Sequence, residues 1–124
     1  MANKPKILLI EDDSFLSSMY VTKLEISGFD VEAAEDGETG LEKVKSYSPD
    51  LVLLDIILPK MSGFEVLESI RKDDAYKDIP VIMLTNLSQR DDVERGLDLG
   101  AQDYLIKAHF TPSEVVTKIK KYLG

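Results

Sequence analysis

The chain has 124 residues, of which 44% are hydrophobic, and its 15 basic and 23 acidic residues give a formal net charge of −8. This length suits one domain with a sizeable core, so we expect residues 1–124 to form a single domain. The negative charge argues against direct binding of nucleic acid or of anionic membrane surfaces. There is no apolar run long enough for membrane insertion and no cysteine for disulfides or thiolate sites, which fits a cytoplasmic protein.

Five strand-like stretches alternate with five helix-like stretches along the chain. The strands are expected at Lys6–Ile10, Asp30–Ala34, Leu51–Asp55, Val81–Thr85 and Asp103–Ile106. The first, third and fourth are continuous apolar runs, typical of central strands covered on both faces, whereas the second and fifth are more polar, as edge strands are. The alternation predicts an α/β fold, a three-layer αβα sandwich around a five-stranded parallel sheet.

Helix start signals support this division. Ser14 is expected to cap the first helix. Asp12 and Asp13 are alternative caps, because carboxylates are favoured at helix N-termini, and of these two Asp13 is preferred. The segments 62–65 (Ser-Gly-Phe-Glu) and 111–114 (Thr-Pro-Ser-Glu) both match the capping box, and Pro112 stands where a helical N–H is dispensable.

Polar side chains stand at the carboxyl ends of four of the expected strands. Glu11 and Asp12 follow the first strand, Asp55 ends the third, Thr85 ends the fourth and Lys107 follows the fifth. All strands of a parallel sheet end on the same edge, and open α/β sheets bind their ligands there. The sequence therefore predicts one site that combines three acids, a hydroxyl group and an ammonium group.

This arrangement resembles the receiver domain of two-component response regulators over nearly the whole chain. Glu11 and Asp12 resemble the acidic pair of that family, and Asp55 resembles its phosphorylated aspartate. Thr85, Lys107 and Tyr104 resemble its switch hydroxyl, its lysine and its aromatic switch residue. The resemblance implies the flavodoxin-like sheet order 2-1-3-4-5. Because no output domain follows Gly124, it also implies a stand-alone, chemotaxis-regulator-like protein, with an excised receiver as the alternative.

The resemblance also implies the chemistry of the site. An aspartate can act as a nucleophile toward phosphorus, and Asp55 would be that nucleophile. Mg²⁺ prefers oxygen ligands, and we expect Asp12 and Asp55 to supply carboxylates, Ile57 a backbone carbonyl and Glu11 a contact through water. Lys107 can pair with Asp55 before the reaction and with phosphate after it. In the absence of metal, crowding of the acids should raise the pKa of at least one of them.

Structural interpretations of the same residues stay open. Asp55 and Lys107 can form a buried ion pair, although such pairs are weak stabilisers. Thr85 can be a strand residue or a helix cap, and Tyr104 can be part of the core.

Three positions depart from common patterns of the family. Asn86 follows Thr85 where a small residue is usual, which would narrow access to the phosphate. Ile57 is apolar where some members carry a polar residue that assists water attack, which favours slow dephosphorylation. Ala108 follows Lys107 where proline is usual, and we expect a trans bond there because a cis bond without proline costs about 3 kcal/mol.

The leading functional hypothesis is a phosphorylation-dependent signalling switch. A sensor histidine kinase or phosphotransfer protein would phosphorylate Asp55 with Mg²⁺, Thr85 would move to the phosphoryl group, and Tyr104 would turn into the vacated space. The signal would reach an unknown downstream protein through the face formed by the fourth helix, fifth strand and fifth helix. Apart from its own phosphoryl transfer and dephosphorylation, the protein would be no enzyme.

Two alternatives remain. One is an aspartate-nucleophile phosphatase, which would need a second acid where Ile57 stands, and the other is a receiver-like scaffold that is not phosphorylated. A nucleotide- or flavin-binding module is disfavoured, because the chain has neither G-x-G-x-x-G nor G-x-x-x-x-G-K-[ST].

Overall fold

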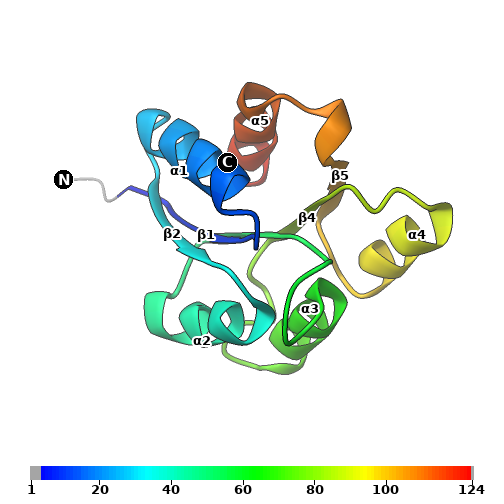
Figure 1. The fold of residues 1–124 in the computed structure, drawn as a ribbon. Helices are drawn as coiled ribbons and strands as arrows, with labels where there is room; N and C mark the ends of the chain where they lie inside the picture. The colour runs from blue at the N-terminus through cyan, green and yellow to red at the C-terminus, as the bar shows by residue number, and fades with distance from the viewer. Residues whose placement is uncertain (1–3, 124) are drawn as a thin grey trace.

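The computed structural model describes residues 4–123, in which strands and α-helices alternate (Figure 1). The elements are β1 (Lys6–Ile10), α1 (Ser14–Ile26), β2 (Asp30–Ala34), α2 (Gly37–Tyr47), β3 (Leu51–Leu54), α3 (Gly63–Lys72), β4 (Val81–Thr85), α4 (Arg90–Asp98), β5 (Asp103–Ile106), a 3₁₀ turn (Lys107–His109) and α5 (Pro112–Leu123). The predicted strands are confirmed, except that β3 ends at Leu54 and leaves Asp55 as the first residue of the following loop.

The sheet is parallel throughout and has the order β2-β1-β3-β4-β5, so the expected α/β fold and strand order are confirmed. Helices α1 and α5 lie on one side of the sheet and α2 and α3 on the other, while α4 lies beside β5 (Figure 1). No helix within residues 4–123 is both long and apolar enough to cross a membrane.

Two apolar clusters, one on each face of the sheet, hold the layers together. In β1, Leu8 and Ile10 belong to the cluster under α2 and α3, whereas Ile7 and Leu9 belong to the cluster under α1 and α5. All four side chains are buried, which explains why the central strands read as continuous apolar runs. Burial of each such side chain stabilises the fold by about 1.5–3 kcal/mol before the loss of conformational entropy is counted.

The cap of α1 differs from the expectation. Ser14 is the first helical residue, and the cap is Asp13, whose carboxylate accepts the N–H groups of Phe15 and Leu16 at 3.0 and 3.1 Å. The expectation for Ser14 is therefore wrong and the alternative is confirmed. The physical reason is that the backbone of Asp13 is still extended, so its side chain folds over the orphan N–H groups of the first turn.

The second capping box is complete. Thr111 accepts the N–H of Glu114 at 3.2 Å, and the carboxylate of Glu114 accepts the N–H of Thr111 at 2.9 Å. At α3, Ser62 accepts the N–H of Glu65 at 3.3 Å.

Candidate functional site

The carboxyl edge of the sheet carries a hollow of about 410 Å³. It is lined by Glu11, Asp12, Asp13, Leu16, Asp55, Ile57, Thr85, Asn86, Leu87 and Lys107. Every residue that the sequence analysis placed in the site, apart from Tyr104, lies on this surface. Their convergence follows from the parallel sheet, because the segments after β1, β3, β4 and β5 all leave it at the same edge.

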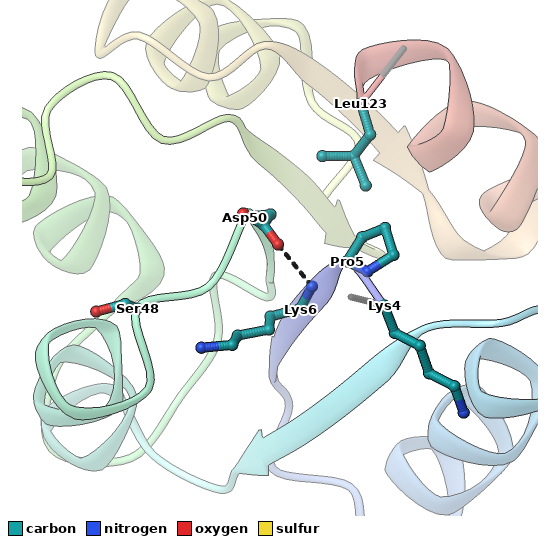
Figure 2. A pocket seen from close by; sticks show the side chains of 6 residues that line it. All are labelled: Lys4, Pro5, Lys6, Ser48, Asp50 and Leu123. Carbon is teal, nitrogen blue, oxygen red and sulfur yellow. Dashed lines mark hydrogen bonds between the residues drawn. The ribbon is translucent and has the colours of Figure 1, made fainter. Parts of the chain in front are cut away.

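A larger hollow of about 520 Å³ lies at the opposite edge, and Figure 2 shows its lining. The amines of Lys4 and Lys6 point in different directions, and the backbone N–H of Lys6 donates to Asp50 at 2.8 Å (Figure 2). The amine of Lys6 donates to the Tyr47 carbonyl at 3.3 Å. Because the charged groups of this hollow do not converge, we place the candidate functional site in the smaller hollow at the carboxyl edge of the sheet.

An ion cluster forms the floor of the functional site. The Lys107 ammonium lies 2.7 Å from Asp55 Oδ2 and also pairs with Glu11 Oε1. Glu11 is 2% exposed, Asp55 is 7% exposed and the Lys107 side chain is 10% exposed. Glu11 and Asp55 follow the neighbouring strands β1 and β3, and the long lysine side chain reaches them from the end of β5. The expected pairing of Lys107 with Asp55 is thus present.

The second oxygen of Asp55 is held by the backbone. Asp55 Oδ1 accepts the N–H of Ile56 at 2.7 Å, so both carboxylate oxygens have partners. The Ile56 carbonyl in turn accepts the N–H of Gly63 at 2.9 Å, which brings the start of α3 against this loop. A Cβ atom at Gly63 would contact the Asp55 backbone carbonyl, so this close approach requires glycine. The loop therefore fixes the orientation of the Asp55 carboxylate.

Burial and pairing shift the pKa values in this cluster. Burial raises the pKa of Glu11, and the negative charge of Asp55 raises it further by a smaller amount. The hydrogen bond from Lys107 acts in the opposite direction and lowers the pKa, but it does not outweigh burial. Burial alone would lower the pKa of Lys107, but hydrogen bonds to Asp55 and Glu11 outweigh it and the pKa is raised. The expected rise for one carboxyl group is present, although its main cause is burial rather than repulsion between acids.

Three acids that line the hollow fit a divalent cation. Glu11, Asp12 and Asp55 each offer a carboxylate oxygen, and these oxygens lie within 4.8 Å of one another. Asp12 is exposed while the other two are buried, so the group opens toward solvent on one side. Hard oxygen donors of this kind, with room for water, suit Mg²⁺. Ile57 lines the same hollow with a side chain that is 64% exposed, and the ligand role of its carbonyl stays a prediction.

Thr85 and Tyr104 meet at one residue of the loop after β4. The Thr85 hydroxyl oxygen accepts the N–H of Leu87 at 3.3 Å, and the Tyr104 hydroxyl donates to the carbonyl of Leu87 at 2.5 Å. The Tyr104 ring lies against Gly96 of α4, where an added Cβ would come within 3.0 Å of it. Burial raises the pKa of Tyr104 to about 12, so the phenol remains a donor. Sequence reasoning missed this link, because it runs through backbone atoms of Leu87.

A second link was also missed. Asn86 Oδ1 accepts the N–H of Ala108 at 3.2 Å and so connects the segments that follow β4 and β5. Residues 4–123 contain no cis peptide bond, so the bond between Lys107 and Ala108 is trans, as expected.

Comparison with known proteins agrees with this geometry. Residues 7–120 match the family described as the response regulator receiver domain, and the chain belongs to that family. Its members are proteins of two-component signal transduction, for which phosphorylation and Mg²⁺ are typical.

Curated relatives and solved structures support the assignment. The chain is 42% identical over 119 residues to the DNA-binding dual master transcriptional regulator RpaA of Synechocystis sp., covering 96% of this chain and 49% of that protein. It is 40% identical over 118 residues to the alkaline phosphatase synthesis transcriptional regulatory protein PhoP of Bacillus subtilis, covering 95% and 48%. A CheY-like receiver domain protein from Methanospirillum hungatei JF-1 superposes with a TM-score of 0.91 at 31% identity, covering 98% and 94%.

These findings correct two expectations. The chain spans about half the length of the curated relatives that it matches, and the similarity to transcriptional regulators does not support a stand-alone, chemotaxis-like protein. The expectation of no direct nucleic-acid binding is contradicted as well, because one of these relatives is named as DNA-binding. The charge argument failed because the net charge of this chain describes only its own surface, whereas the relatives are longer proteins.

Proposed function

We propose that this receiver domain accepts a phosphoryl group on Asp55 from a sensor histidine kinase or a phosphotransfer protein. The observation that carries the proposal is the buried Asp55 carboxylate in a hollow that it shares with two further acids, a hydroxyl group and an ammonium group. A carboxylate oxygen of Asp55 attacks the phosphorus of a phosphohistidine. The new P–O bond forms as the P–N bond breaks, and the imidazole nitrogen leaves with the electron pair and takes up a proton.

The residues around Asp55 have separate roles in this reaction. The Ile56 N–H and the Lys107 ammonium hold the two carboxylate oxygens, so the nucleophile is oriented before the phosphoryl donor arrives. Lys107 then pairs with the phosphoryl oxygens as negative charge moves onto Asp55. Glu11, Asp12 and Asp55, with the Ile57 carbonyl, would hold Mg²⁺, which would supply positive charge against the negative charge of the reacting groups.

The switch begins at Thr85. When the Thr85 hydroxyl donates to a phosphoryl oxygen and the side chain moves, the N–H of Leu87 loses its acceptor. The change reaches Tyr104 because the Tyr104 hydroxyl donates to the carbonyl of the same residue, Leu87. Helix α4 follows directly, its cap residue Gln89 makes no side-chain hydrogen bond, and Gly96 is its one buried residue. A helix with so few buried contacts can shift between two positions at low cost in free energy, so the α4-β5-α5 face would carry the signal.

The output is the part of the proposal that draws on the relatives. Because the matched regulators are named as transcriptional, we place the receiver in control of a DNA-binding output, with residues 1–124 acting as one domain in the cytoplasm. A phosphatase is disfavoured because Ile57, exposed beside Asp55, offers no acid to activate water. A scaffold that is never phosphorylated would have no need of three clustered acids beside a lysine.

The test is incubation with acetyl phosphate and Mg²⁺, followed by intact mass spectrometry. We expect one phosphoryl group on the parent and on Asp91→Asn, a matched change of an exposed acid on α4, and none on Asp55→Asn. The proposal is contradicted if Asp55→Asn is labelled like the parent or if the parent stays unlabelled. Steady turnover of para-nitrophenyl phosphate would instead support the phosphatase.

A further inference from the structure

One hydrogen bond joins the two segments that bring Thr85 and Lys107 to the site. The parallel ladder between β4 and β5 ends at the pair Thr85 and Ile106. Directly beyond it, the Asn86 side chain accepts the N–H of Ala108 at 3.2 Å. The bond therefore continues the connection between the strands by one step, with a side chain in place of the backbone.

We propose that Asn86 is a positioning residue for phosphoryl transfer: it fixes the peptide after Lys107 and thereby holds the lysine ammonium between Glu11 and Asp55. The inference rests on the proposed function and assigns to Asn86 a role in the same site. It also gives the residue a purpose other than narrowing access to the phosphate.

The geometry explains why it matters that Asn86 fixes the peptide after Lys107. Lys107 reaches Asp55 through a four-carbon stem with many rotamers, and ordering that stem costs conformational entropy. The Ala108 N–H belongs to the peptide that directly follows the Lys107 Cα atom, so fixing this peptide fixes the base of the stem. The next turn adds little, because the Phe110 N–H reaches the Lys107 carbonyl at a long 3.4 Å. Asn86 thus restricts the region that the ammonium can occupy.

Donor and acceptor form a matched pair in this chain. Proline at position 108 would have no N–H to donate, and a small apolar residue at position 86 would have no oxygen to accept. Because the Ala108 N–H can only donate, the Asn86 oxygen must face it, and the Asn86 NH₂ group remains available at the hollow that this residue lines. The two departures from the family pattern are therefore the two halves of one contact.

The test compares four variants with the parent. Asn86→Leu keeps the size of the side chain and removes the acceptor oxygen, whereas Asn86→Asp keeps both the size and an acceptor oxygen. Ala108→Pro removes the donor N–H. The double variant Asn86→Leu/Ala108→Pro completes a double-mutant cycle. The first readout, on metal-free unphosphorylated protein, is the hydrogen exchange of the Ala108 amide together with the ¹⁵N chemical shift of the Lys107 ammonium. The second is the rate of labelling by acetyl phosphate with Mg²⁺.

We expect Asn86→Leu to speed Ala108 exchange and to slow labelling, each by about two- to three-fold, the lower end of the range for loss of one hydrogen bond, because both residues are exposed to solvent. The Lys107 shift should move in Asn86→Leu and stay near the parent value in Asn86→Asp. When Ala108 is already replaced by proline, Asn86→Leu should not change the Lys107 chemical shift further, because the hydrogen bond between residues 86 and 108 is already absent.

Other results would overturn the inference. An unchanged Lys107 shift in Asn86→Leu, or fully additive effects in the double variant, would show that Asn86 does not act through Ala108. If the parent is labelled and Asn86→Leu is labelled equally fast, the positioning role fails while the proposed function stands. If the parent is not labelled but the Lys107 shift responds as expected, the proposed function fails and the contact between the loops stands.

Discussion

Lys107→Met removes the ammonium group from the ion cluster and keeps a side chain of similar length. Glu11 and Asp55, which are 2% and 7% exposed, then lose their common counter-ion. Breaking a buried pair by removing one partner costs about 3–5 kcal/mol, and because the pair adjoins an open hollow that water can enter we expect about 2–3 kcal/mol here. For a domain of this size each kcal/mol shifts Tm by about 3–5 °C, so the variant should melt about 6–15 °C lower without metal.

Mg²⁺ should reverse much of this loss. A ligand that binds only the folded state adds about 2.7 kcal/mol at 100 times its Kd, and removal of the competing ammonium should strengthen binding. Thermal unfolding followed by circular dichroism, with and without Mg²⁺, measures both effects. The control is Lys118→Met. The Lys118 ammonium lies 3.8 Å from the Asp103 carboxylate in a more exposed pair, so this substitution should lower the free energy of unfolding by less than about 1 kcal/mol. A metal-free Lys107→Met protein as stable as the parent would refute the reasoning, as would Mg²⁺ stabilisation confined to the parent.

Three further outcomes are expected. Thr85→Ala should still accept phosphate on Asp55, but amide chemical shifts along α4 and β5 should respond weakly to beryllium fluoride; a response equal to the parent's would exclude Thr85 from the switch. Ile57→Asn should shorten the lifetime of the phosphorylated form about five-fold, the effect of about 1 kcal/mol from one hydrogen bond to the attacking water, and an unchanged decay in a mass-spectrometric time course would contradict this. Hydrogen bonds from Thr111 lower the pKa of Glu114, so the ionised carboxylate stabilises the fold above its ordinary pKa of 4.5 and this contribution is lost as pH falls through the lowered value. Glu114→Gln should therefore unfold more easily at pH 7, with a difference in urea midpoint that disappears in acid, and a difference independent of pH would argue against it.

The fold and most of the site were predictable because they depend on patterns spread along the chain. Continuous apolar runs marked β1, β3 and β4, and β5 was recognisable as a more polar edge strand. The polar residue at the end of each of these parallel strands had to lie at their common carboxyl edge. Glu11, Asp55 and Lys107 therefore converge without any knowledge of the loops.

The parts that were missed depend on loop conformation. The choice of Asp13 over Ser14 as the cap is decided by the backbone angles of one residue. The links through Leu87 and Ala108 use main-chain N–H and carbonyl groups, which nearly every residue type offers. Asn86 and Ala108 stood out as departures from the family pattern, but nothing in the sequence showed that they are in contact. The charge argument about nucleic acid failed for a different reason, since the net charge describes only these 124 residues, whereas the matched transcriptional regulators are about twice as long.

The central claim is that Asp55 itself carries the phosphoryl group. The most direct measurement is reduction of the protein with borohydride after treatment with acetyl phosphate and Mg²⁺, followed by peptide mass spectrometry. Borohydride converts an aspartyl phosphate to homoserine and leaves a free aspartate unchanged. We predict homoserine at position 55 and unmodified aspartate at Asp12 and Asp13. Homoserine at either of those positions, with Asp55 intact, would contradict the account.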